Sequence, residues 1–185
     1  MRFSGPVVAA LWTLLALAPA LAHEGHGHDE TASGATAPPP HAFAQLAGLA
    51  GEWLGAEDGP LWKRGELVSR FELTGAGSAL IERLFPGSAH EMTTLYHRDG
   101  ADLVLTHYCA AGNQPRMRAV APAVGARDFE FAFDGGANLD AARDSHMHSA
   151  RIQLVGPDEL IAEWQTWNAG KPDGPPERFH LLRRK

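Results

Sequence analysis

The stretch MTTLYHRDGADLVLTHYC, residues 92–109, contains the clearest secondary-structure signal in the chain. Its two halves, Met92 to Tyr96 and Leu103 to Cys109, are rich in the β-branched, aromatic and aliphatic residues that favour strands. Asp99-Gly100 lies between them, and an Asp-Gly pair is typical of the tight turn of a β-hairpin. The stretch therefore predicts two antiparallel strands joined by a short turn.

The same pattern recurs along most of the chain. Further short apolar segments are separated by Gly, Pro, Asn and Asp turn residues; they are Leu67 to Leu73, Leu80 to Phe85, Met117 to Ala121, Phe129 to Phe133, His148 to Val155, Leu160 to Trp167 and Phe179 to Leu182. One more strand is expected around Trp53, after a short helix with apolar spacing from Phe43 to Ala50. No strand-helix-strand spacing is present, so the pattern predicts an antiparallel all-β domain, either a barrel or a sandwich.

Composition excludes several classes of protein. Of the 185 residues, 44% are hydrophobic and 21% are charged, which is typical of one compact globular domain. The formal net charge is −6, and the longest basic run is Arg183 to Lys185, so nucleic acid is not an expected partner. Cys109 is the only cysteine, which excludes an internal disulfide and the paired-cysteine metal motifs.

The first 22 residues have the three parts of a secretory signal peptide. Arg2 supplies the positive region, Val7 to Ala18 is almost unbroken apolar sequence, and Ala20 to Ala22 forms a small-x-small cleavage site. The apolar stretch is shorter than the roughly 20 residues that a membrane-spanning helix needs. We therefore expect residues 1–22 to be removed, leaving a periplasmic or secreted protein without a membrane anchor.

Residues 23–40 form a segment of different composition. They contain three histidines near the start and three prolines at the end, with small or polar residues between them. Such a segment has almost nothing to bury, so we expect a flexible His- and Pro-rich leader whose imidazoles have adventitious affinity for Cu(II), Ni(II) or Zn(II). The folded domain is then expected to occupy residues 41–185.

The two ends of this domain decide between a barrel and a sandwich. Gly51-Glu52-Trp53 opens the first strand, and Arg183 follows Phe179 and Leu181 on one face of the last strand. This arrangement resembles the lipocalin and calycin group, in which a Gly-x-Trp motif packs across the barrel floor and an Arg of the final strand lies over the indole. The resemblance implies a lipocalin-like barrel of about eight to ten strands, with a cation–π contact between Arg183 and Trp53.

A second resemblance covers most of residues 43–185. The segment from Tyr96 to Gly100, the run from Leu105 to Met117 and the triplet His146-Met147-His148 look like those of a family of secreted, functionally uncharacterised bacterial proteins with a lipocalin-like domain. The resemblance implies the fold and no established activity. It does not extend to the leader.

Strand parity places the hairpin's polar residues inside the predicted barrel. Counting across the Asp99-Gly100 turn, Tyr96 should face Leu103 and Met92 should face His107. The face with Tyr96, Met92 and Leu103 is the more apolar one, so it should point inward. His107 then points inward with it.

The same parity extends to other histidines and to the turn residues. Cys109 follows His107 on the inward face, and His90 lies just beyond Met92. On their own strand, His146 and His148 should both face the interior. Beside the turn at 113–115, Arg116 should reach the barrel mouth while Arg118 points outward.

These residues support three hypotheses of function. The leading one is an exported barrel that binds a small, partly apolar ligand in its interior, with imidazoles holding a polar group of the ligand. The candidate ligand-binding residues are His90, Met92, Tyr96, Leu105, His107, Cys109, Asn113, Gln114, Arg116, His148, Trp164 and Trp167.

The two alternatives use the same inward histidines. In one, His107, His146 and His148 bind Zn or Cu, in a metal carrier or a metal-dependent enzyme. In the other, the barrel binds haem and one inward histidine is the axial ligand. No Gly-x-Ser-x-Gly or other nucleophile motif is present, so no catalytic residue is assigned and an enzyme is the less favoured class.

Overall fold

Strands form where the aliphatic and β-branched residues alternate with polar ones, and turns fall at the glycines between them. The computed structural model describes residues 41–185, so the predicted signal peptide and leader lie outside the described residues. The elements are α1 (Phe43–Ala47), β1 (Gly51–Gly55), β2 (Leu67–Thr74), β3 (Ala79–Leu84), β4 (Met92–Asp99), β5 (Asp102–Tyr108), β6 (Gln114–Ala119), β7 (Asp128–Ala137), β8 (His146–Gly156), β9 (Glu159–Asn168), β10 (Lys171–Pro172) and β11 (Glu177–Arg183).

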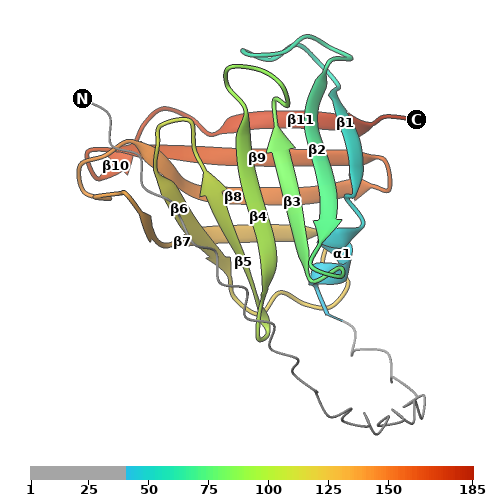
Figure 1. Ribbon diagram of the computed structural model, residues 1–185, viewed down its shortest axis with the longest axis horizontal. Helices are drawn as coiled ribbons and strands as arrows, with labels where there is room; N and C mark the ends of the chain where they lie inside the picture. The colour runs from blue at the N-terminus through green and yellow to red at the C-terminus, as the bar shows by residue number, and fades with distance from the viewer. Residues whose placement is uncertain (1–40) are drawn as a thin grey trace, which may run out of the picture. The chain divides into compact units, whose positions relative to one another are not determined.

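Ten of these strands close into an antiparallel barrel. Strands β1 to β9 pair in sequence order, and β11 pairs with β9 on one side and with β1 on the other. The two-residue strand β10, which the sequence pattern did not predict, pairs only with β9 and stays outside the ring. In Figure 1, β2 to β5 run steeply across the front while β8, β9 and β11 cross behind them. The prediction of an all-β barrel of about eight to ten strands with a short N-terminal helix is confirmed.

Helix α1 and the last residues of β11 lie at one end of the barrel, which we call the closed end. Here α1 buries Phe43 and Leu46 against the core, and the indole Nε1 of Trp53 donates a hydrogen bond to the carbonyl oxygen of Leu49 at 2.8 Å. Because neighbouring strands are antiparallel, the opposite end, the open end, gathers the loops at 56–66, 85–91, 109–113 and 138–145 together with the loop after β9. The fold therefore leaves one end for a site.

The register of the β4–β5 hairpin differs from the prediction by two residues. Asp99 pairs with Asp102, so the two turn residues are Gly100 and Ala101, and Thr94 rather than Met92 lies opposite His107. The physical reason is that Gly100 has a φ of 63° and takes the first central position of the turn. A shift of two residues preserves side-chain parity, so the inward face stays the predicted one.

Side chains from all around the ring fill the barrel. The largest fully buried ones are aromatic and aliphatic and form one core: Trp53, Tyr96, Phe43, Phe129, Phe131, Leu46, Leu80, Leu103, Leu105, Met117, Ile152 and Leu160. Within residues 41–185, no helix is long and apolar enough to cross a membrane. The few buried polar groups therefore stand out against an apolar interior.

Candidate functional site

The open end of the barrel gathers most of the residues that the sequence analysis singled out. β5 ends just after His107, and β8 begins with His146. The second half of β9 carries Trp164 and Trp167. Antiparallel pairing brings these strand ends to the same end of the barrel. Chemistry-bearing residues from three separate strands thus share one region.

His107 is one of the two most enclosed polar residues of this region, the other being His146. Its side chain points inward as predicted and is only 2% exposed, and its ring centroid lies 5.0 Å from that of Trp164. Ring atom Nδ1 is hydrogen-bonded to the Thr94 hydroxyl at 2.9 Å, whereas Nε2 is buried without any hydrogen-bond partner. Burial lowers the pKa of His107 to about 4, so the imidazole is neutral at pH 7.

A buried carboxyl group lies two strands away from this histidine. Glu82 is 3% exposed and accepts two hydrogen bonds, from the Ser69 hydroxyl at Oε1 and from the Tyr96 phenol at Oε2, each 2.7 Å long. Burial raises the pKa of Glu82, and burial together with the neighbouring Glu82 raises that of Tyr96. The sequence analysis missed Glu82, although its position between Leu80 and Leu84 on β3 has the parity of an inward residue.

Thr94 lies between the carboxyl group and the imidazole. It pairs with Glu82 on one side and with His107 on the other, and its hydroxyl is hydrogen-bonded to Nδ1 of the His107 ring. These polar residues lie in one row across β2 to β5, which we call the polar chain: Ser69, Glu82, Tyr96, Thr94 and His107. The Nε2 atom of His107 is its unpaired end.

A pair of histidines lies at the rim of the open end. His146 Nδ1 is 2.8 Å from the carbonyl oxygen of Asp144, and its Nε2 is 3.0 Å from Nδ1 of His148. A carbonyl only accepts, so His146 carries its hydrogen on Nδ1 and His148 must donate from its own Nδ1. The His148 ring is stacked between Trp167 at 3.7 Å and Phe133 at 4.6 Å, and burial and His146 lower its pKa.

The structure brings together two of the three histidines predicted to bind a metal. His146 and His148 are in contact, whereas His107 belongs to the polar chain. Among residues 41–185, no group of three or more His, Cys, Asp or Glu side chains could hold a metal ion. His146 and His148 lie together, as strand parity predicted, although a register irregularity between Met147 and Ser149 interrupts the pairing of β8 at His148.

Two residues predicted to face inward do not. His90 is exposed in the loop before β4, because the strand begins only at Met92, which is itself half-buried against the core. Cys109 lies just after the end of β5 in a turn, where its sulfur accepts a weak hydrogen bond from the Ala111 backbone at 3.5 Å. Parity holds only within a strand, so neither residue continues the inward row.

The residues of the β5–β6 turn and of β6 differ in burial and direction. Asn113 is buried and donates to the Ser145 carbonyl oxygen at 2.8 Å, and Gln114 donates to the Gly112 carbonyl oxygen at 3.2 Å. Arg116 does not reach the mouth, because it alternates with inward residues of β6 and faces Asp134 on the outer surface at 3.4 Å. The outward position of Arg118 is confirmed by its ion pairs there.

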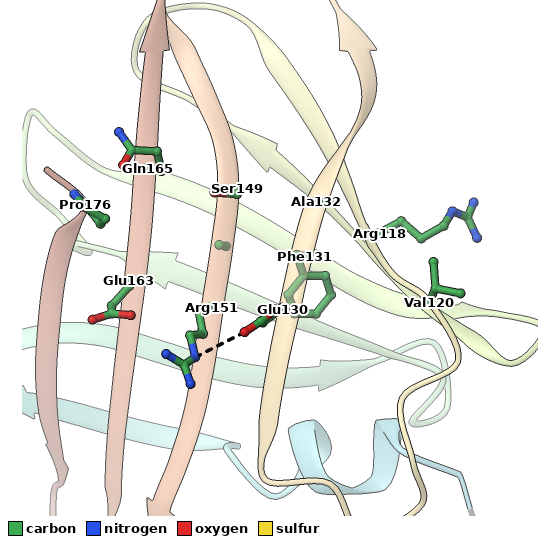
Figure 2. A pocket seen from close by; sticks show the side chains of 11 residues that line it. Arg118, Val120, Glu130, Phe131, Ala132, Ser149, Arg151, Glu163, Gln165 and Pro176 are labelled. Atoms are coloured by element: carbon green, nitrogen blue, oxygen red, sulfur yellow. Dashed lines mark ion pairs between the residues drawn. The ribbon is translucent and has the colours of Figure 1, made fainter. Parts of the chain in front are cut away.

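The remaining predicted residues lie in the interior or near it. Tyr96, Leu105 and Trp164 are buried and Trp167 is half-buried. A separate hollow of about 450 Å³ lies on the outer face of the barrel (Figure 2). It is lined by outward residues of β7 to β9, including the ion pair of Glu130 and Arg151 at 3.9 Å, and is open to solvent. The outer hollow is thus unconnected to the polar chain.

Comparison with known proteins adds no family and no activity. No protein-family model matches the chain, and no curated protein matches it. The function is therefore inferred from the closed barrel and from the geometry of its open end.

Proposed function

We propose that this protein is an exported barrel that binds a small, partly apolar and uncharged molecule at its open end, with His107 as the polar anchor. The observation that carries the proposal is the buried Nε2 atom of His107, which has no partner. Buried polar atoms are nearly always hydrogen-bonded, and an unpaired one costs about 1–3 kcal/mol. A ligand that pairs with Nε2 recovers this energy.

The surroundings of His107 indicate the chemistry of the ligand. The imidazole is neutral at pH 7 because its pKa is about 4, so it offers a hydrogen bond without a charge. A charged ligand group would remain unpaired in this apolar interior, which disfavours it strongly. Trp164 at 5.0 Å supplies an aromatic surface for an apolar ring or chain. Apolar contact with one or two oriented polar groups is the usual composition of a small-molecule site.

Thr94 holds the His107 ring in position in the ligand-free protein. Its hydrogen bond to Nδ1 restrains the rotation of the imidazole and keeps Nε2 directed away from the polar chain. Because Nε2 is closed off from solvent, a ligand must displace side chains around it, and the Trp164 ring lies against the imidazole. Binding should therefore alter tryptophan fluorescence.

The proposal also includes export of the protein to the periplasm and its membership of a lipocalin-like family. The signal peptide predicted at residues 1–22 supports delivery to the periplasm, and the closed barrel is compatible with the secreted bacterial lipocalin-like family that the sequence resembles. Amino-terminal sequencing of the protein recovered from the periplasm should give His23 as the first residue. A mature protein that still begins at Met1 would contradict this part of the proposal.

Two neutral probes test the ligand site. We expect 2-naphthol, which can hydrogen-bond, to bind with an affinity at least about tenfold higher than that of naphthalene, because one hydrogen bond contributes about 1.4 kcal/mol. Quenching of tryptophan fluorescence measures both affinities. His107→Phe should remove this preference, and His90→Phe, at an exposed histidine outside the barrel, should retain it.

Native mass spectrometry with elemental analysis provides a second measurement. Protein purified from the periplasm without chelators should carry an organic mass that His107→Phe loses. The proposal is wrong if neither probe binds, if both variants bind 2-naphthol alike, or if the only stoichiometric component is a metal ion or haem.

A further inference from the structure

A second polar atom at the open end of the barrel is buried without a partner. We infer that Oδ1 of Asn113 is the second polar anchor of the ligand site and accepts a hydrogen bond from the ligand. The ligand then carries a hydroxyl or N–H group at a distance from the group that His107 binds. This inference rests on the proposed function, because it adds a contact to the same site and narrows the class of molecule that fits it.

The unpaired polar atoms of the interior are few, and two of them lie in one region. Among residues 41–185, three buried side-chain atoms have no hydrogen-bond partner: Nδ1 of His41, Nε2 of His107 and Oδ1 of Asn113. His41 precedes α1 at the closed end, whereas the other two residues belong to the open end. Buried polar atoms are nearly always hydrogen-bonded. Two unpaired atoms in one region therefore indicate a molecule that binds both.

The protein itself sets the orientation of the Asn113 amide. Its nitrogen donates to the carbonyl oxygen of Ser145 at 2.8 Å, and the residue is 4% exposed. A carbonyl oxygen only accepts, so the reversed amide would place two acceptors against each other. Oδ1 is therefore the end of the side chain that is left for a ligand, and an amide oxygen can only accept a hydrogen bond.

The neighbouring amide of Gln114 is paired at both ends. Its nitrogen donates to the carbonyl oxygen of Gly112 at 3.2 Å, and its oxygen accepts from the Asn138 side chain at 2.7 Å. Gln114 is only half-buried, so water could have served either end. Asn113 is more deeply buried and uses one end only, which is the reverse of what burial alone would favour.

Strand pairing places Asn113 one inward position from His107. The side chains of Asn113, Pro115 and Met117 are buried and alternate with half-buried ones, so Asn113 continues the inward row of β6. Leu105 of β5 pairs with Met117. His107 therefore lies opposite Pro115, and Asn113 is the next inward residue toward the open end. Two residues of a strand span about 7 Å, so one small molecule can reach both anchors.

The two anchors define the chemistry of the ligand. Asn113 requires a donor, such as a hydroxyl group or the N–H of an amide, while His107 pairs with a second polar group. Between the anchors lies Pro115, and the Trp164 ring lies against the imidazole at 5.0 Å, so the middle of the ligand should be apolar. Ketones, esters and ethers without a hydroxyl or N–H group would leave Oδ1 unpaired. We expect a neutral molecule with two polar groups, at least one of them a donor, on an apolar frame.

The test compares 2-naphthol with 2,6- and 2,7-dihydroxynaphthalene, which add a second hydroxyl group to the same rings. At least one of the two diols should bind the wild type at least about tenfold more tightly than 2-naphthol, which is the effect of one added hydrogen bond. Asn113→Leu should abolish this advantage. Asn168→Leu, the same substitution at an exposed residue at the end of β9, should retain it. Quenching of tryptophan fluorescence measures all these affinities.

Carbon NMR of the wild type tests the same contact without a substitution. The chain has three asparagines, Asn113, Asn138 and Asn168, so ¹³C labelling of asparagine gives one side-chain carbonyl signal for each. Saturation with the tighter diol should move the Asn113 signal downfield, because its oxygen then accepts a hydrogen bond. The other two signals should stay in place.

The outcomes separate this inference from the proposed function. Asn113 is not an anchor if 2-naphthol binds and neither diol binds more tightly, if Asn113→Leu keeps the advantage of the diol, or if the Asn113 signal does not move in the complex. The ligand site then stands on His107 alone. If none of the three probes binds, the proposed function is wrong and the second anchor is overturned with it.

Discussion

The guanidinium of Arg183 lies over the indole of Trp53, with its central carbon 4.4 Å from the ring centroid. The same group donates hydrogen bonds of 2.7 Å to the carbonyl oxygens of Gly48 and Ala50. The last strand of the barrel is thereby attached both to the first strand and to the segment that follows α1. This contact, which the chain ends led us to expect, is confirmed. It closes the end of the barrel opposite to the proposed site.

Removing this contact should destabilise the whole barrel. Arg183→Ala loses the cation–π contact and the charged hydrogen bonds, so we expect the free energy of unfolding to fall by about 2–4 kcal/mol. Arg183→Lys keeps the charge but not the planar fork, so its loss should be intermediate. Urea unfolding measures both values. An Arg183→Ala protein as stable as the wild type would show that the closed end does not depend on this residue.

Gly59, in the loop between β1 and β2, should not tolerate a larger residue. Trp62 is stacked on Phe179 at 4.9 Å, and a Cβ atom at Gly59 would lie 2.1 Å from the indole. Gly59→Ala should therefore displace Trp62 from the open end, lower the stability by about 1–3 kcal/mol and red-shift the tryptophan emission. Gly156→Ala is the control, because the added methyl group there finds only ordinary contacts. Equal melting temperatures for the two variants would refute the prediction.

The burial of His107 should make stability depend on pH. Its pKa is lowered from 6.5 to about 4, so the folded state resists protonation and the unfolded state does not. The contribution is fully present above pH 6.5 and is lost as the pH falls toward 4, by up to about 3 kcal/mol in total. Glu82 acts in the opposite sense, because its raised pKa favours the folded state at low pH.

The measurement is therefore a comparison of variants. His107→Gln should flatten the fall in unfolding free energy between pH 6.5 and pH 4 relative to the wild type. His97→Gln, at a residue outside the core, should leave the fall unchanged. Parallel curves for wild type and His107→Gln would mean that the imidazole does not titrate differently on unfolding.

Tyr96→Phe should be destabilising mainly at high pH. The substitution removes the donor to Oε2 of Glu82 and leaves only the Ser69 hydroxyl, and an ionised, buried carboxylate that loses one of its two donors is destabilised by about 1–3 kcal/mol. At low pH, Glu82 is protonated and the loss should be smaller. Tyr108→Phe, at an exposed phenol, should change stability little at either pH. Thermal unfolding at pH 8 and pH 5 measures the difference, and a loss that is independent of pH would contradict it.

Much of the fold could be predicted because local patterns carry it. The strand periods, the turn glycines and the Gly-x-Trp and Arg pair at the chain ends each depend on a few neighbouring residues. Errors arose where parity was counted beyond a strand, as at His90 and Cys109. The hairpin register was two residues off because Gly100 takes the first position of the turn, a choice that Asp99-Gly100 does not settle.

The sequence by itself determined the all-β class, the inward position of His107 and the contact between Arg183 and Trp53, since each follows from strand parity or from a motif. The tertiary structure alone decided which groups meet. Glu82 joins Thr94 and His107 because three strands pair in one register, and His107 reaches Trp164 across strands that are not neighbours. The physical reason is that hydrogen bonds and ring contacts depend on distances between segments far apart in the chain, and those distances exist only once the barrel has closed.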